Sequence, residues 1–276
     1  MNELSEFTHD FDGERLSGLT AGAPGRATAV LLHGAGNGSK QRLLPLLTEF
    51  AERGRHALAF DFSGHGDSTG SLADLSLRRR FEQAVAVVDA HAPADASLVL
   101  VGFSMSGQTV ADLVRHYGPR VVAVGLCAPA VYAPEAWDVP FENGQGRFSE
   151  IIRTPAGWRS SRALEVFRAY GGRAVLAVPG TDAVIPPAVT EAVQDALSAR
   201  ARYTRFELPE AEHRLGSWFR EHAGDRREFV ECVLAESDER AAVEAASAWA
   251  RPKGGGGRRV PPGRRAPGAG AGFQRL

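Results

Sequence analysis

Cysteine is scarce in this sequence. Among 276 residues there are only two, Cys127 and Cys232. Two cysteines are too few for a disulfide framework, and neither stands in a C-x-x-C or zinc-binding spacing. The composition therefore argues against a small disulfide-stabilised secreted domain and favours a reducing, cytoplasmic location.

Long apolar runs are also missing. No stretch approaches the roughly 18 consecutive apolar residues that a membrane-spanning helix needs. Residues 1–6 are polar and acidic, whereas a signal peptide has a basic end followed by an apolar run. We therefore expect a protein that has no membrane span and is not exported.

Positive charge is concentrated at one end of the chain. Residues 251–276 carry seven Arg and Lys and no acid, so removing them changes the formal net charge from −1 to −8. A domain this acidic is a poor candidate for binding nucleic acid, which depends on a basic surface. No glycine-rich phosphate loop, metal-ligand cluster or dinucleotide fingerprint stands in a suitable context, so we expect no cofactor and no metal.

The apolar content, 43%, is sufficient for the core of one globular domain. We expect a catalytic domain over residues 1–235. From residue 236 an Ala- and Glu-rich stretch favours a helix, and beyond it Gly, Pro and Arg predominate. Such a composition cannot bury enough apolar surface to fold, so we expect a disordered tail without a catalytic role; basic tails can also bind acidic partners.

Short apolar runs alternate with longer segments of helical period. After an opening hairpin over residues 5–20, with its turn at Asp12-Gly13, the runs of strand length are 29–32, 56–60, 98–101, 121–126, 174–178 and 204–208. The segments of helical period are 41–53, 77–91, 105–116, 187–199 and 216–235. This alternation predicts an α/β fold with a mostly parallel central sheet and crossover helices on both faces.

Residues 132–165 interrupt the alternation. They hold scattered Pro and Gly and no clear strand, and we interpret them as a short cap inserted over the site. The aromatic side chains of the cap are candidates for covering an apolar or aromatic part of a substrate, and they could equally form a small core of the cap itself. The candidate substrate-binding residues are Trp137, Phe141, Phe148 and Trp158.

Ser104 stands where a buried strand turns directly into a helix. In Gly102-Phe103-Ser104-Met105-Ser106, small residues lie two before and two after the serine. Such a turn, called a nucleophile elbow, brings neighbouring backbone close and forces the serine into a strained conformation. The second small position is Ser rather than the commoner Gly, which keeps the steric logic of the pattern. A serine at a strand end usually caps a helix, but this context makes Ser104 the candidate nucleophile.

A serine hydroxyl needs a base, and that base needs an acid that fixes its tautomer. Asp182 lies just past the apolar run 174–178, and His213 lies just past 204–208. Taken singly, Asp182 could form a turn and His213 could be an exposed loop residue. Their positions at strand ends, and the chain order Ser, Asp, His, predict a catalytic triad of Ser104, Asp182 and His213.

A glycine-bearing loop, His33-Gly34-Ala35-Gly36, closes the first buried strand. We expect the backbone N–H groups of Ala35 and Met105 to form an oxyanion hole, with the positive end of the helix after Ser104 pointing at the same place. We expect His33 to order this loop by hydrogen bonding rather than to transfer protons.

With these motifs in view, the chain resembles the α/β-hydrolase superfamily over roughly residues 5–235. Within it the chain is similar to the monoacylglycerol lipase, cinnamoyl esterase and serine aminopeptidase-like group. The resemblance rests on segments 33–36, 61–68 and 102–106, on Gly180-Thr181-Asp182 and on His213. It implies the α/β-hydrolase fold, with a cap between the strands at 121–126 and 174–178. It also implies that the turn at 61–68 shapes the loop near the site, with His65 and Asp67 in structural roles.

These observations predict a serine hydrolase that cleaves a small carboxylic ester, or a related amide or thioester, through an acyl-enzyme intermediate. The expected partner is a small-molecule acyl substrate. Two alternatives stay open, because a fold does not determine a reaction. One is an acyltransferase or carboxylate-eliminating lyase with the same triad, and the other is a non-catalytic ligand-binding member of the superfamily.

Overall fold

One sheet runs through the part of the chain that the structure describes. The computed structural model describes residues 4–235, in which eight strands pair in the order β1-β2-β4-β3-β5-β6-β7-β8. β2 pairs antiparallel with β1 and β4, and the other neighbouring pairs are parallel. The mostly parallel α/β sheet expected from the sequence is confirmed. The strands are β1 (Leu4–Phe11), β2 (Glu14–Ala21), β3 (Ala27–Leu32), β4 (His56–Phe60), β5 (Ser97–Phe103), β6 (Val121–Cys127), β7 (Arg173–Thr181) and β8 (Arg202–Glu212).

The central strands bury side chains on both sides of the sheet, as continuous apolar runs predict. In β5, Leu98 and Leu100 pack into one hydrophobic cluster, while Val99 and Val101 pack into a second cluster on the opposite face. All four side chains are at most 1% exposed. The sheet is therefore the middle of three layers.

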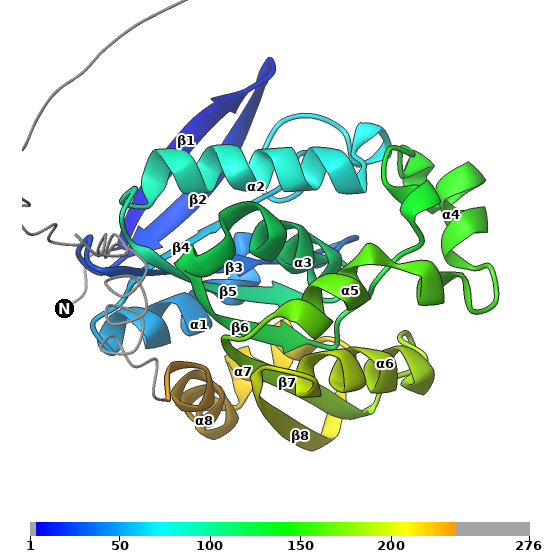
Figure 1. The fold of residues 1–276 in the computed structure, drawn as a ribbon. Coiled ribbons are helices and arrows are strands. Elements are labelled where there is room, and N and C mark those ends of the chain that lie inside the picture. Colours follow the sequence, from blue (N-terminus) through cyan, green and yellow to red (C-terminus); the bar gives the residue numbers. More distant parts are fainter. Residues whose placement is uncertain (1–3, 236–276) are drawn as a thin grey trace, which may run out of the picture. The chain divides into compact units, whose positions relative to one another are not determined.

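Helices form the two outer layers (Figure 1). Side chains of α2, α3, α5 and α6 complete the cluster that contains Leu98 and Leu100, and side chains of α1, α7 and α8 complete the other. The helices are α1 (Lys40–Glu52), α2 (Leu77–His91), α3 (Ser106–Tyr117), α5 (Arg162–Ala169), α6 (Pro187–Ser198), α7 (Leu215–Glu221) and α8 (Ala223–Leu234).

Most predicted elements coincide with the structure, and one does not. Strand 56–60 and helix 77–91 have their predicted bounds. The prediction of a single helix over 216–235 is wrong, because the backbone of His222 leaves the helical conformation, with φ −112° and ψ 86°. The His222 ring stacks on Trp218 at 3.6 Å between centroids, and α8 begins after it.

The segment expected to form the cap contains short helical turns and no strand. These are η3 (Pro134–Ala136), η4 (Glu142–Gly144), α4 (Gly146–Ile152) and η5 (Gly157–Ser160). The predictions did not include α5, which begins inside this segment. The hydroxyl of Ser161 caps α5 by accepting a hydrogen bond from the N–H of Ala163 at 3.2 Å, and α5 packs against α3 and α6. Its residues therefore belong to the outer helical layer.

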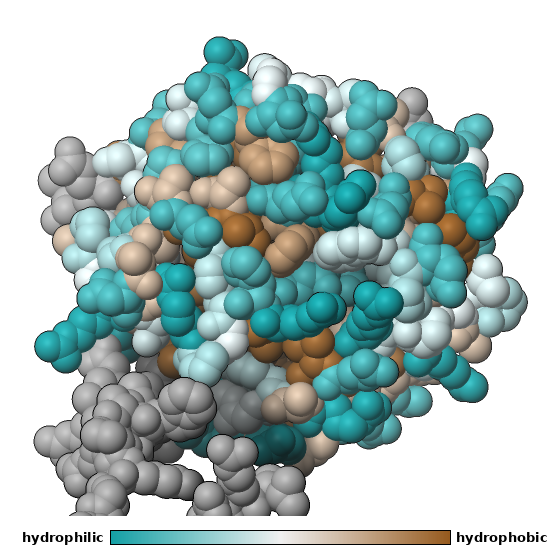
Figure 2. All heavy atoms as spheres, turned by 45° about the horizontal axis from the view of Figure 1, so that its top comes forward, coloured by the Kyte–Doolittle hydropathy of each residue, from teal (hydrophilic) through white to brown (hydrophobic). Residues whose placement is uncertain are grey.

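The face presented in Figure 2 is mainly polar, with apolar side chains in small patches between polar ones. Among the described residues, the large apolar side chains with high exposure are Leu4, Ile152 and Val184. The predicted helix and tail over residues 236–276 lie outside the described residues.

The chain connections diverge at β3. β4 pairs with one edge of β3, and β5 pairs with the other edge. In open α/β sheets, ligands bind in the crevice outside the carboxyl ends of the strands at such a point. Ser104 follows β5 directly, and the loop of Ala35 follows β3, so both lie at this point of the sheet.

Candidate active site

Ser104 occupies the sharp turn between β5 and α3. Its φ is +49°, in the left-handed region that residues other than glycine rarely adopt. Three hydrogen bonds hold the turn, because Ser104 donates to the carbonyl of Cys127 at 2.9 Å and its own carbonyl accepts from Gly107 at 2.9 Å and from Ala130 at 2.8 Å. A Cβ atom at Gly102 would lie 2.6 Å from Val110 Cγ2, so that position requires glycine.

The three predicted triad side chains meet. His213 Nε2 lies 3.0 Å from Ser104 Oγ, and His213 Nδ1 lies 2.9 Å from Asp182 Oδ2. The other carboxylate oxygen of Asp182 accepts hydrogen bonds from the N–H groups of Val184 at 2.7 Å and Ile185 at 2.9 Å. Asp182 is thereby fixed in orientation, and its contact places a proton on Nδ1 of His213, which leaves Nε2 free to accept the proton of Ser104.

The pairing of β7 with β8 brings Asp182 and His213 together. Asp182 follows the last residue of β7, and His213 follows the last residue of β8. Near these ends the register shifts, and Thr181 Oγ1 donates to the carbonyl of Ala211 at 2.9 Å. A Cβ at Gly180 would lie 2.1 Å from the carbonyl oxygen of Pro209, so the close approach of the two strands depends on this glycine.

The loop after β3 lies against Ser104. A Cβ at Gly34 would be 3.1 Å from Cβ of Ser104. Within residues 4–235, the N–H groups of Ala35 and Met105 donate to no backbone oxygen in the loops and turns. Both amides are therefore available to a ligand, as an oxyanion hole requires.

His33 holds the loop of Ala35 in place. Its Nδ1 lies 2.6 Å from the carbonyl oxygen of Gly34, and its Nε2 accepts a hydrogen bond from the N–H of Phe62 at 3.2 Å. Since Nε2 accepts, the proton is on Nδ1 and is donated to Gly34. Burial, assisted by the nearby charge of Arg80, lowers the pKa of His33 well below its ordinary value, so the ring stays neutral.

A buried ion pair holds the turn at 61–68. Lys40 Nζ lies 2.6 Å from Asp61 Oδ2 and 2.6 Å from Asp67 Oδ2, and the side chains of Lys40 and Asp61 are 2% and 0% exposed. Burial opposes the charge of Lys40, but its hydrogen bonds to Asp61 and Asp67 outweigh this effect and raise its pKa. A Cβ at Gly66 would lie 2.1 Å from Asp61 Oδ2, which explains the glycine.

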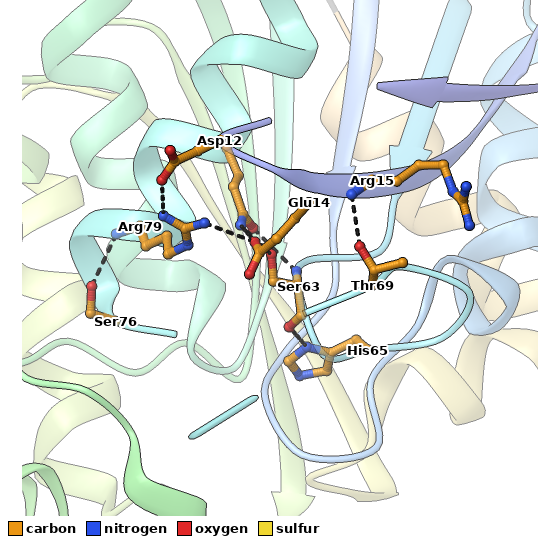
Figure 3. A network of polar contacts seen from close by, with 9 residues as sticks. Asp12, Glu14, Arg15, Ser63, His65, Thr69, Ser76 and Arg79 are labelled. Carbon is orange, nitrogen blue, oxygen red and sulfur yellow. Dashed lines mark hydrogen bonds and ion pairs between the residues drawn. The ribbon is translucent and has the colours of Figure 1, made fainter. Parts of the chain in front are cut away.

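The opening hairpin supports the same turn from the other side (Figure 3). Arg79 of α2 donates to Asp12 Oδ2 at 2.9 Å and to Glu14 Oε2 at 2.9 Å. Glu14 Oε2 also accepts a hydrogen bond from the hydroxyl of Ser63, and the N–H of Arg15 donates to Thr69 Oγ1 at 2.8 Å. β2, α2 and the 61–68 turn are thus joined by side chains that make no contact with the triad in Figure 3.

The four cap aromatics lie in two kinds of environment. Phe141 and Phe148 are 4% and 3% exposed, and their rings are 4.5 Å apart between centroids. They pack in the main core, as the alternative interpretation of the cap allowed. Trp137 and Trp158 are partly buried at the margin of this core. A role for any of the four in substrate binding stays a prediction.

A cavity of about 610 Å³ lies between α2, α3 and the start of the cap. Gln108 and Asp112 of α3 line it together with Trp137, and no triad residue does. Gln108 Nε2 donates to the two oxygens of Asp112 at 3.3 and 3.2 Å. Burial, only partly offset by the hydrogen bond from Gln108, raises the pKa of Asp112 to about 7.

The described residues contain no group of three or more His, Cys, Asp or Glu side chains that could hold a metal ion. None of the helices described here combines the length and the apolar character that crossing a bilayer would take. Cys127 and Cys232 are both free thiols, and burial raises the pKa of each.

Two cations near the site were not among the sequence-based candidates. Lys40 pairs with Asp61 and Asp67, and Arg80 donates at 2.7 Å to the carbonyl of His33. The spacing of Arg80 from Leu77 on the buried face of α2 is the signal that could have identified it, because residues three apart share a helix face.

Comparison with known protein families gives a match over residues 23–159. The matching model is Hydrolase_4, described as serine aminopeptidase, S33. A curated relative, the uncharacterized protein YfhR of Salmonella typhi, is 32% identical over 131 residues, which are 45% of this chain and 42% of that protein. The match therefore spans less than half of the length of this relative.

Solved structures resemble the chain over most of its length. The thioesterase domain from the curacin biosynthetic pathway has a TM-score of 0.62 and 15% identity, covering 83% of this chain and 99% of its own. The serine hydrolase CarC, involved in carbazole degradation, has a TM-score of 0.62 and 18% identity, with 84% and 99% covered. Est1E from Butyrivibrio proteoclasticus, with ferulic acid bound, has a TM-score of 0.61 and 18% identity, with 83% and 100% covered. At these identities the likeness establishes a shared fold.

Proposed function

This chain belongs to the α/β-hydrolase superfamily, and from that premise we propose that it is a serine hydrolase with the triad Ser104, His213 and Asp182. The observation that carries the proposal is the pair of hydrogen bonds joining the three side chains, 3.0 Å from Ser104 to His213 and 2.9 Å from His213 to Asp182. The nucleophile is within direct proton-transfer distance of the base, and the acid already orients that base.

In the first half of the reaction, Ser104 Oγ attacks the carbonyl carbon of the substrate, and its proton passes to His213 Nε2. The carbonyl π electrons move onto oxygen and give a tetrahedral oxyanion. When the carbonyl re-forms, the bond to the leaving group breaks, and the leaving oxygen takes the proton from His213. The products are an alcohol and an acyl group on Ser104.

In the second half, water attacks the acyl carbon and gives one proton to His213 Nε2. Collapse of this second tetrahedral intermediate breaks the bond to Ser104 Oγ, which recovers its proton from His213 as the carboxylic acid leaves. Asp182 stays ionised throughout and stabilises the imidazolium that forms twice in the cycle.

We assign stabilisation of both oxyanions to the N–H groups of Ala35 and Met105. The α3 helix that begins after Ser104 adds the positive end of its dipole. In comparable enzymes the loss of one oxyanion donor costs about 3 kcal/mol of transition-state stabilisation. The loop after β3 is therefore as necessary to the proposed reaction as the triad.

The proposed substrate is a small carboxylic ester with an apolar or aromatic part. Trp137 and Trp158 are the partly buried cap aromatics that we propose for contact with it. Ferulic acid, the ligand of Est1E, is an aromatic acid, which is the class of product that such an ester would release. Its presence in a structure of similar fold supports this choice of substrate class.

Labelling with a fluorophosphonate probe, followed by peptide mass analysis, tests the proposal. Wild-type protein and a Ser160→Ala control, altered at an exposed cap serine, should both be labelled on Ser104. The Ser104→Ala variant should not be labelled. Wild-type protein should also release acid and alcohol from nitrophenyl esters of acetate, butyrate or an aromatic acid.

Other outcomes would favour the alternatives. Release of an alkene with the acid would indicate a lyase, and transfer of the acyl group to an added alcohol in preference to water would indicate an acyltransferase. If wild-type protein were not labelled at Ser104, a non-catalytic ligand-binding role would replace the proposed hydrolase.

A further inference from the structure

Arg80 is a buried cation that lacks an acidic partner. Its side chain is 0% exposed, and its guanidinium carbon lies 3.7 Å from the centroid of the Phe62 ring. The neighbouring Arg79 pairs with Asp12 and Glu14, whereas among the described residues no ion pair includes Arg80. Burial lowers the pKa of Arg80 to about 9. Because an unpaired buried charge is costly, the position calls for an explanation.

The hydrogen bonds of Arg80 converge on the active site. One terminal nitrogen donates to the carbonyl of His33 at 2.7 Å and lies 2.8 Å from Oγ of Ser106. The hydroxyl of Ser106 donates in turn to the same carbonyl of His33 at 2.6 Å. These three groups come from α2, from the first turn of α3 and from the end of the loop's strand, β3. They connect the nucleophile elbow directly to the oxyanion loop.

This contact constrains two successive peptide groups. Arg80 and Ser106 fix the carbonyl of the peptide between His33 and Gly34, and the ring of His33 fixes the carbonyl of the peptide between Gly34 and Ala35. The second peptide carries the N–H of Ala35. In a trans peptide the N–H points away from the carbonyl oxygen, so holding Gly34 by its carbonyl also sets the direction of that N–H.

Ser106 is the position at which the elbow departs from the usual glycine. Its side chain is 0% exposed, and its only use of space beyond a glycine is the Cβ and the hydroxyl that bonds to His33. The substitution of Ser for Gly in the motif is therefore matched by a partner for the added hydroxyl, and by Arg80 as a second donor to the same carbonyl.

We propose that Arg80 and Ser106 are positioning residues that hold the oxyanion loop in register with the nucleophile elbow. This inference rests on the proposed serine hydrolase function. Their effect is exerted through His33 on the N–H of Ala35, and so it is realised chiefly in the transition state, when the oxyanion forms.

Steady-state kinetics on an ester that the wild-type enzyme hydrolyses tests the proposal. We expect Ser106→Ala to lower kcat about tenfold and Arg80→Met to lower it about a hundredfold, with KM changed less than about twofold. The double variant should be little slower than Arg80→Met, because both residues hold one carbonyl. Arg80→Lys, which keeps a buried donor, should recover about tenfold of the loss.

Arg79→Met is the matched control, because it removes an arginine from the same helix whose partners are Asp12 and Glu14. We expect its kcat to stay within about twofold of wild type. Affinity for phenylboronic acid, which forms a tetrahedral anionic adduct on an active serine, should fall in parallel with kcat/KM in the Arg80 and Ser106 variants only.

The result that overturns the inference is a kcat and a boronic acid affinity in Arg80→Met and Ser106→Ala equal to those of Arg79→Met. A merely structural role would lower the melting temperature alone. If Arg80→Met does not fold, Ser106→Ala decides, since it removes a single hydroxyl. Failure of the wild-type protein to react with the fluorophosphonate would instead disprove the proposed function, and this inference with it.

Discussion

Single residues in this protein show two opposite consequences of burial. Burial lowers the pKa of His33 and raises the pKa of Asp112, so in both cases it favours the neutral form. For His33 the neutral form is the useful one, because one ring nitrogen donates to Gly34 while the other accepts from Phe62. For Asp112 it means that ionisation is opposed, since its hydrogen bonds come only from Gln108.

Replacing His33 by Ala should reduce kcat about a hundredfold with little change in KM. The expected reason is that the carbonyl of Gly34 loses its donor, so the N–H of Ala35 is no longer held in one direction. Ester hydrolysis by His33→Ala, compared with an exposed-histidine control such as His116→Ala, measures the effect. Equal losses in both variants would show that His33 has no special part in the loop.

Asp112→Asn should stabilise the protein more at pH 8 than at pH 4.5. The raised pKa of about 7 means that the folded chain keeps a proton on Asp112 which the unfolded chain releases above about pH 4. Wild-type stability should therefore decline as the pH rises from about 4 to about 7, and an amide avoids this loss. We expect a gain of about 1–2 kcal/mol at pH 8, after allowance for partial exposure, from urea unfolding. An equal difference at both pH values, or one matched by the exposed Asp95→Asn, would contradict this account.

At the scale of elements, α1 is tied to the 61–68 turn by its first residue. Lys40 meets Asp61 in the interior, whereas the other partner, Asp67, has a side chain 69% exposed. The amide of Lys40 also donates to Asp61 Oδ1 at 2.6 Å. Asp61 is therefore the acid whose charge depends on Lys40, and the turn depends on both.

Lys40→Met should destabilise the protein by about 3–5 kcal/mol, because it leaves the carboxylate of Asp61 buried without its cation. Asp67→Asn should have a much smaller effect, since water can replace an exposed partner. Denaturant midpoints of the two variants measure the difference. Similar midpoints would mean that the inner and outer halves of this network are equivalent, contrary to the burial of Asp61.

The sequence predicted the triad because its members are encoded by position relative to strands. A residue that directly follows a parallel strand lies at the carboxyl edge of the sheet, and Ser104, Asp182 and His213 all do so. The strands themselves were predictable because each is a short run of apolar residues that is buried on both faces.

The supporting cations could not be predicted in the same way. In the sequence Arg78-Arg79-Arg80 resembles an ordinary solvated run, yet Arg80 is buried while Arg78 is exposed. Lys40 pairs with an acid 21 positions away, and only the pairing of β3 with β4 brings them together. The break at His222 was also missed, because His is compatible with a helix and the ring contact with Trp218 is a local packing effect.

For the molecule as a whole, the proposed catalytic groups lie within residues 33–213, at one edge of a sheet that ends before the basic tail. Deleting residues 251–276 should therefore leave kcat and KM for an ester within about twofold of the full-length values. Loss of activity or of solubility in the truncated protein would show that the tail contributes to the folded enzyme or to its partners.

The central claim is that Ser104 and His213 act as one unit. We expect Ser104→Ala and His213→Ala each to lower kcat by about four orders of magnitude or more while the protein stays folded. The most direct test is the kcat of the double variant on the same ester. The account predicts a value close to that of either single variant, because removing one member already disables the other. Losses that multiply would contradict the triad.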